Sequence, residues 1–285
     1  MAFRDQTSAM AYMSQHFVAL MCDYETHNSD GTWTKQEPVA FSGFLLELHA
    51  VGFWVTAGHC LKDELDNPLR RGQIRITGGA FLDHFGHEAV FEQGIPFTYE
   101  AGCGYYVESP EYGLDFALIK LDSLKVQAFL NNKLVFISRA NWEHQHKLTF
   151  DFHLMLGLVG ETETTIQDGK IVLKMEQVLL KVDQISRDDI EELPPGIYEL
   201  PSELWFFGTV PPKEQIESIK GTSGGPIYGF RYNDQKRLAY HVVALQSRWW
   251  PEPRITFGCP LALFAEECYR ILEPIVRELR AENGT

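Results

Sequence analysis

The chain has 285 residues, of which 45% are hydrophobic and 13% aromatic, and its formal net charge is −14. This composition is typical of a globular protein with a sizeable core and excludes a disordered chain. The acidic excess argues against sequence-independent binding to nucleic acid, which needs clustered Lys and Arg. No apolar run reaches the roughly 18–20 residues of a membrane-spanning helix, and residues 1–17 lack the pattern of a secretory signal. We therefore expect neither nucleic acid nor a membrane as a partner.

Short apolar or alternating runs, separated by Gly, Pro, Asn and Asp, predict strands along most of the chain. In chain order these runs are residues 17–22, 41–50, 52–57, 73–79, 115–121, 148–160, 170–182, 198–208, 226–230 and 238–247. Many short strands without regular helices between them predict an all-β barrel or sandwich.

The last segment, residues 261–283, repeats apolar side chains at steps of three and four and predicts an amphipathic helix. Pro274 should kink this helix or split it into two. We expect the helix to pack on the β body, and the alternative is a helix that binds a partner protein.

The cysteines are odd in number and widely spaced, with no C-x-x-C pair, so a zinc site built on thiolates is not expected. We predict free thiols in a reducing compartment, the cytoplasm. Two histidine pairs, "HFGH" (84–87) and "HQH" (144–146), have metal-like spacing but no supporting ligands, and we interpret them as exposed loops. No metal and no cofactor is predicted. The cysteines are Cys22, Cys60, Cys103, Cys259 and Cys268.

The motif "GTSGGP" (221–226) places Ser223 among glycines and allows three interpretations. It matches the nucleophile elbow of an α/β-hydrolase, it could cradle a phosphate, or it could be a simple turn. The elbow needs the serine before the histidine and a helix directly after it, whereas only His241 follows and "PIYGF" continues as a strand. A phosphate loop lacks the Lys-Ser/Thr that should follow the glycines.

Two further blocks precede this motif: "TAGHC" (56–60) contains His59, and "LDFALI" (114–119) contains Asp115. In the order His, Asp, Ser, the three blocks resemble the signatures of the chymotrypsin-like (trypsin-like) serine proteases, and the resemblance spans nearly the whole chain. It implies two antiparallel six-stranded β-barrels and a C-terminal helix. Residues 1–123 would carry His59 and Asp115, residues 124–260 would carry Ser223, and residues 261–285 would form the helix.

The resemblance implies a serine endopeptidase whose substrates are proteins or peptides. Ser223 would be the nucleophile, His59 the general base and Asp115 the group that orients the imidazole. The backbone N–H groups of Gly221 and Ser223 would form the oxyanion hole. A catalytically silent, protease-like binding module is the alternative.

The chain departs from the family at two positions. Secreted members pair the cysteine after the histidine with a cysteine on the preceding strand, but here the counterpart of Cys60 is Ser42. Zymogens have Asp before the serine, to pair with a new N-terminal amine, and this chain has Thr222. We therefore predict an intracellular, bacterial-type member that does not need N-terminal cleavage. Such an enzyme is either constitutively competent or controlled by a partner or a loop rearrangement, and we favour control by a regulatory protein partner.

The specificity of the site is predicted from three residues. Glu217 stands six positions before Ser223, where the family commonly floors the substrate pocket, and would favour a basic side chain. Ser247 would be the backbone partner of the substrate. Arg248 would either neutralise Glu217 or itself favour an acidic side chain.

Overall fold

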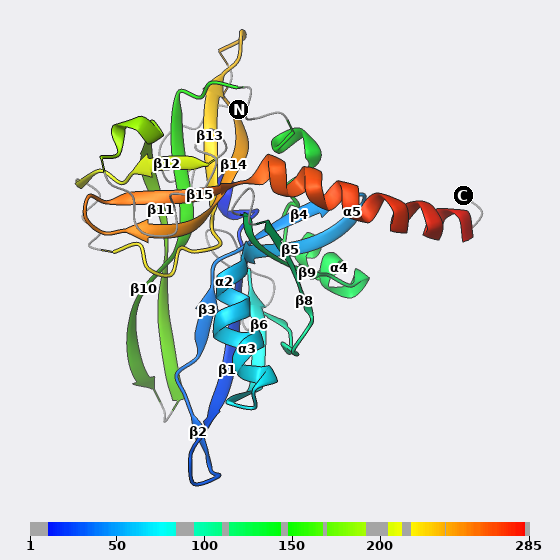
Figure 1. Ribbon diagram of the computed structural model, residues 1–285, viewed down its shortest axis with the longest axis vertical. Helices are drawn as coiled ribbons and strands as arrows, with labels where there is room; N and C mark the ends of the chain where they lie inside the picture. The colour runs from blue at the N-terminus through cyan, green and yellow to red at the C-terminus, as the bar shows by residue number, and fades with distance from the viewer. Residues whose placement is uncertain are drawn as a thin grey trace.

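A computed structural model describes residues 11–83, 94–109, 114–143, 148–167, 170–191, 205–212, 218–236 and 238–282. The fold is mostly β, as the alternating runs predict, with a C-terminal helix that extends to one side (Figure 1).

The second half of the chain closes into a barrel of six antiparallel strands. Their order around the barrel is β10-β11-β12-β15-β14-β13. Apolar side chains of these strands, such as Met155, Leu180 and Ile227, are buried in one cluster. Burial of this apolar surface drives the closure. The strands are β10 (Phe152–Gln167), β11 (Lys170–Gln184), β12 (Phe206–Thr209), β13 (Pro226–Tyr232), β14 (Leu238–Trp250) and β15 (Ile255–Pro260).

The first half forms two sheets, and the predicted second closed barrel is not shown for the residues that the structure describes. One sheet has the order β4-β5-β9-β8, and the other has the order β2-β1-β6-β7 with β3 paired to β1. A single isolated bridge, Phe17 to Phe44, joins β4 to the segment before β1. One bridge is not a continuous ladder, and closure needs a ladder. The strands are β1 (Ala19–His27), β2 (Trp33–Lys35), β3 (Val39–Phe41), β4 (Phe44–Leu48), β5 (Val51–Ala57), β6 (Ile74–Leu82), β7 (Ile95–Pro96), β8 (Gly104–Ser109) and β9 (Leu114–Lys120).

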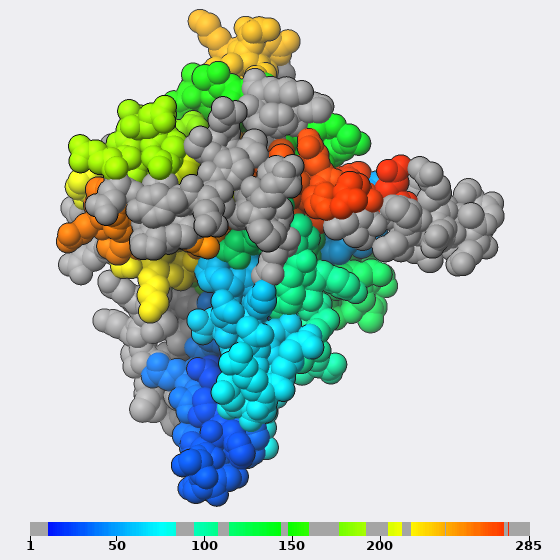
Figure 2. Space-filling model, in the orientation of Figure 1, coloured from blue at the N-terminus to red at the C-terminus, as the bar shows by residue number. Residues whose placement is uncertain are grey.

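Several short helical segments lie between the strands, and the sequence did not predict them. The first follows β5 directly as α2 (Gly58–Leu61), a π-helical turn (Lys62–Asp66) and α3 (Asn67–Arg70), and it lies on the face shown in Figure 2, in cyan. All of them are shorter than about 14 residues, and in segments this short the helical periodicity of apolar side chains is hard to recognise. The others are α4 (Ser123–Asn131) and the 3-10 turns Arg139–Asn141 and Arg187–Asp189.

The predicted C-terminal helix is present as α5 (Leu261–Glu282) and continues through Pro274. The prediction that Pro274 splits the helix into two is therefore wrong. The first turns pack on the β body, because the ring of Phe264 stacks on that of Phe116 in β9, with centroids 3.9 Å apart. Among the described residues, no helix is long and apolar enough to cross a membrane.

Strand pairing brings the three sequence blocks to one place. β5 pairs with β9, with Ala57 opposite Phe116, so the residues after β5 lie beside the start of β9. β13 pairs with β14, with Pro226 opposite Leu245, so the loop before β13 lies beside residues 246–247. The N–H of Gly224 donates to the carbonyl of Gln246 at 2.8 Å, which fixes the loop there.

Candidate active site

His59 lies on α2, immediately after the buried strand β5. It donates two hydrogen bonds to the carboxylate of Asp115. The Nδ1 of His59 donates to Oδ2 of Asp115 at 2.7 Å, and the backbone N–H of His59 donates to Oδ1 at 2.8 Å. The glycine before the histidine permits this approach, because a Cβ on Gly58 would stand 2.8 Å from Oδ1 of Asp115. The imidazole is therefore held in one orientation.

Asp115 receives a third hydrogen bond, from the buried hydroxyl of Ser247 at 2.6 Å. Burial raises the pKa of Asp115, but the hydrogen bonds from His59 and Ser247 outweigh burial and hold the pKa below its ordinary value. Asp115 is therefore a carboxylate at neutral pH, which accepts from every one of these donors.

The pKa of His59 moves the other way. Burial lowers it, but the hydrogen bond to Asp115 and the contact with the Cys60 sulfur outweigh burial and raise the pKa to about 10. The Cys60 sulfur lies 3.6 Å from Nε2 of His59. The raised pKa favours the protonated form of His59 in this arrangement.

Ser223 lies in a tight loop built by glycines and Thr222. Gly221 has φ +98° and Gly224 has φ +93°, a region that favours glycine. Thr222 is buried, and both its N–H and its hydroxyl donate to the carbonyl of Ile219, at 3.1 and 2.8 Å. Where zymogens have an aspartate, this loop therefore carries a threonine that satisfies its own turn.

The predicted oxyanion donors flank this threonine. Among the described residues, the backbone N–H groups of Gly221 and Ser223 donate to no protein acceptor. The hydroxyl of Ser223 makes a long contact of 3.5 Å with the carbonyl of Ser247. The side chain thus lies in the same cluster as Asp115 and Ser247, and among the described residues its hydroxyl makes no hydrogen bond to Nε2 of His59.

The other predicted site residues have mixed outcomes. Arg248 is exposed at the surface of β14, next to Ser247. Glu217 lies outside the described residues, as do the two histidine pairs at 84–87 and 144–146. The described residues contain no cluster of three or more His, Cys, Asp or Glu that could hold a metal ion. None of the five cysteines, all of which are described, forms a disulfide.

Sequence reasoning missed three contacts of the site. The sequence indicates Cys60 only as a potential disulfide partner, whereas its sulfur lies 3.6 Å from Nε2 of His59. It indicates Ser42 only as a replaced cysteine, whereas its hydroxyl donates to the carbonyl of Gly221. For Ser247 it predicts a backbone role, whereas the side-chain hydroxyl donates to Asp115. Adjacency in sequence could have indicated Cys60, whereas the others depend on tertiary contact.

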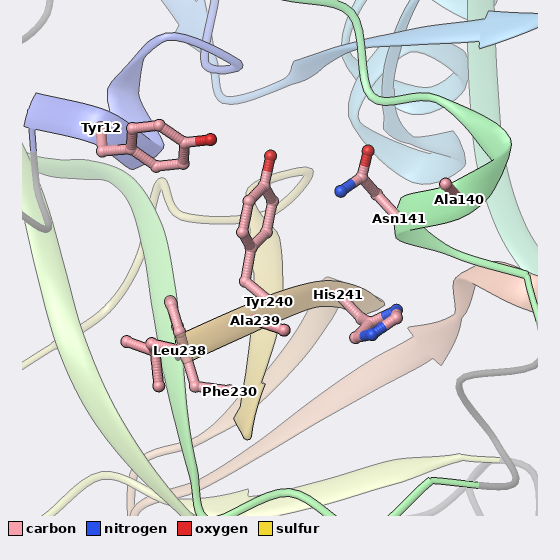
Figure 3. Close-up of a pocket in the computed structure, with 8 residues that line it drawn as sticks. All are labelled: Tyr12, Ala140, Asn141, Phe230, Leu238, Ala239, Tyr240 and His241. Atoms are coloured by element: carbon pink, nitrogen blue, oxygen red, sulfur yellow. The ribbon is translucent and has the colours of Figure 1, made fainter. Parts of the chain in front are cut away.

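A cavity of about 400 Å³ lies apart from these residues, lined by Tyr12, the 3-10 turn at 139–141 and the start of β14. Figure 3 shows the hydroxyls of Tyr12 and Tyr240 and the amide of Asn141 turned toward the same space. The hydroxyl of Tyr240 also lies 2.7 Å from Nε2 of the buried His16. None of the predicted site residues lines this cavity, so it is not the site described above.

Comparison with known proteins supports the fold alone. The chain is similar to the crystal structure of a scabies mite inactivated protease paralogue, with a TM-score of 0.51 and 12% identity, over 92% of this chain and 94% of that one. A structure reported with the Sesbania mosaic virus VPg protein shares 12% identity over 88% of each chain at a TM-score of 0.41, a likeness too weak to indicate a shared fold. No family model and no curated protein matches the chain. The fold therefore resembles that of a chymotrypsin-like protease paralogue.

Proposed function

We propose that the protein is a serine endopeptidase that cleaves protein or peptide substrates through Ser223, His59 and Asp115. The observation that carries the proposal is the double hydrogen bond of Asp115 to His59, beside a glycine-built loop that presents Ser223 and two backbone N–H groups for which the described part of the chain offers no acceptor. This is the set of groups that acyl transfer needs: a nucleophile, an oriented base and donors for the developing oxyanion.

In the proposed reaction, the Oγ of Ser223 attacks the substrate carbonyl carbon while its proton passes to Nε2 of His59. The N–H groups of Gly221 and Ser223 donate to the carbonyl oxygen as it becomes negative. The C–N bond then breaks, and His59 returns the proton to the leaving amine, which leaves an acyl-enzyme that water hydrolyses with His59 again as base. Asp115 stabilises the imidazolium throughout.

The described arrangement is a resting one, because Nε2 of His59 faces Cys60 and the hydroxyl of Ser223 faces the carbonyl of Ser247. A substrate backbone N–H that binds the same Ser247 carbonyl would compete for the Ser223 hydroxyl. Substrate binding would thereby favour rotation of Ser223 toward His59. This fits the proposal that activity is controlled by a binding event, either of the substrate or of a regulatory protein, rather than by N-terminal cleavage.

Several finer points remain predictions. One is the preference for a basic residue before the cleaved bond, through Glu217 with Arg248 beside it. The others are the division into residues 1–123, 124–260 and 261–285, the bacterial type and the cytoplasmic setting. Five cysteines without a disulfide favour a reducing compartment.

A silent binding module is the second candidate, and the resting contacts of His59 and Ser223 favour it. A proteome-derived peptide library separates the two candidates. We expect the full chain to cleave peptides and the Ser223→Ala variant to cleave none, with the same melting temperature. Absence of cleavage by the wild-type chain, with and without cell extract as a source of activator, would support the binding module.

The pH dependence of cleavage should report the raised pKa of His59. The base must be neutral, so with a pKa of about 10 the value of kcat/KM should rise with pH and level off near 10. The Cys60→Ala variant lacks the sulfur that helps to raise the pKa of His59. The rising limb of its pH profile, where kcat/KM increases with pH, should therefore move to lower pH. The matched variant Cys103→Ala, at a half-buried thiol, should leave the limb in place. A limb at the same pH in Cys60→Ala would contradict the account.

A further inference from the structure

The hydroxyl of Ser42 joins the first half of the chain to the loop of Ser223. Ser42 lies between β3 and β4 and is fully buried. Its Oγ donates to the carbonyl of Gly221 at 2.8 Å and accepts from the backbone N–H of Leu158, in β10, at 2.9 Å. The N–H of Leu158 can only donate, so the single proton of the hydroxyl goes to Gly221. The direction of this hydrogen bond is thus fixed.

The backbone of Ser42 takes part in the same contact region. Its carbonyl accepts from the hydroxyl of Thr56 at 2.7 Å, at the end of β5. Gly224 packs directly on this pair, because a Cβ there would lie 2.1 Å from Oγ1 of Thr56 and 2.2 Å from the carbonyl oxygen of Ser42. On the other side of the loop, a Cβ on Gly157 would lie 2.7 Å from Cβ of Thr222. The loop is therefore enclosed between Ser42 and Thr56 on one side and β10 on the other.

The contact with Gly221 acts on the peptide between the two proposed oxyanion donors. The carbonyl of Gly221 is held by Ser42, and the N–H of Thr222 in the same peptide is held by the carbonyl of Ile219. With both ends of the peptide bonded, its plane is fixed. The N–H of Gly221 lies one peptide before it and that of Ser223 one peptide after it, so rotation of this peptide would change the backbone angles at Gly221 and Thr222 that relate it to both N–H groups.

We propose that Ser42 is a positioning residue for the oxyanion hole, which it orients through the carbonyl of Gly221. This inference rests on the proposed function. It assigns a role to the position where the resembling family carries a cysteine that pairs with the counterpart of Cys60: here a hydroxyl instead ties the loop of Ser223 to the first half of the chain. Without the hydroxyl, the buried N–H of Leu158 and the half-buried carbonyl of Gly221 would both lose that partner, and the peptide would be free to turn.

The test compares Ser42→Ala with Ser14→Ala in the full chain. Ser14 is equally buried and its hydroxyl also crosses to the second half, donating to Oε1 of Gln177 at 2.9 Å, but these contacts do not involve the loop. The readouts are the melting temperature, the second-order rate of reaction with a fluorophosphonate, and kcat and KM on a cleaved peptide. We expect Ser42→Ala to react with the fluorophosphonate at least about tenfold more slowly than wild type. On the peptide, kcat should fall and KM should stay unchanged, because the oxyanion contact forms in the transition state. Ser14→Ala should stay within about twofold of wild type.

A folded Ser42→Ala variant that reacts at the wild-type rate would overturn this inference and leave the proposed function intact. A wild-type chain that does not react would overturn both. If Ser42→Ala does not fold, the pair Ser42→Thr and Ser42→Val decides, since their side chains have nearly the same volume and differ in the hydroxyl. We expect the Thr variant to react about tenfold faster than the Val variant, and equal rates would overturn the inference.

Discussion

We expect Asp115→Asn to lower kcat about ten-thousand-fold while the chain stays folded. The reason lies in the two bonds from His59. Oδ1 of Asp115 accepts from the backbone N–H of His59, which can only donate, so the remaining oxygen of Asn must stay at that position. The new NH₂ group then faces Nδ1 of His59, where Oδ2 now accepts.

That exchange reverses the tautomer of the imidazole. Nδ1 would have to accept from Asn, so the proton of the neutral ring would move to Nε2, the nitrogen that should take the proton of Ser223. The measurement is kcat on a cleaved peptide together with a histidine NMR spectrum, which distinguishes the two tautomers.

Asp122→Asn serves as the matched control. Asp122 caps α4, where its side chain accepts from the N–H of Lys125 at 2.8 Å, and none of its contacts involves the site. Its kcat should equal that of wild type. If Asp115→Asn kept more than about one tenth of the wild-type kcat, well outside the loss expected for a reversed tautomer, His59 would not be the base of the reaction.

The second large effect is expected from Gly224→Ala. The new Cβ would overlap Oγ1 of Thr56 and the carbonyl oxygen of Ser42, at 2.1 and 2.2 Å, and the residue has φ +93°. Unfavourable backbone conformation and overlap with fixed atoms together should lower the free energy of unfolding by about 2–6 kcal/mol. Chemical denaturation measures this loss, and the fluorophosphonate rate should fall with it because the loop of Ser223 is displaced.

Gly31→Ala separates the two causes. Gly31 has φ +84°, but no atom lies within 4 Å of a Cβ built there. This variant should lose only the conformational part, roughly 1–2 kcal/mol. Equal losses in the two variants would show that Gly224 is not packed against Ser42 and Thr56 as described.

The sequence predicted the individual strands and the helix better than it predicted whether the sheets close into barrels. The apolar runs at 52–57 and 115–121 are confirmed as β5 and β9, and the C-terminal periodicity is confirmed as α5. These predictions succeed because side-chain periodicity reports which face is buried. Whether sheets close into barrels depends on pairing between distant strands, which periodicity does not encode, and the first half accordingly differs from the prediction.

The same distinction applies to the site. Motif order pointed to His59, Asp115 and Ser223, and strand pairing explains why Asp115 reaches His59. The contacts of Cys60, Ser42 and the Ser247 hydroxyl depend on distances between segments far apart in sequence. Each is a small polar side chain that reads locally as a turn or core residue, so no pattern singles it out.

The proposed function depends most directly on the reactivity of one hydroxyl. The measurement is mass spectrometry of the full chain after treatment with a fluorophosphonate, followed by digestion and identification of the modified peptide. The account predicts one label per chain, on Ser223, and no label in Ser223→Ala or after denaturation. A native wild-type chain that takes up no label, or takes it up on another residue, would contradict it.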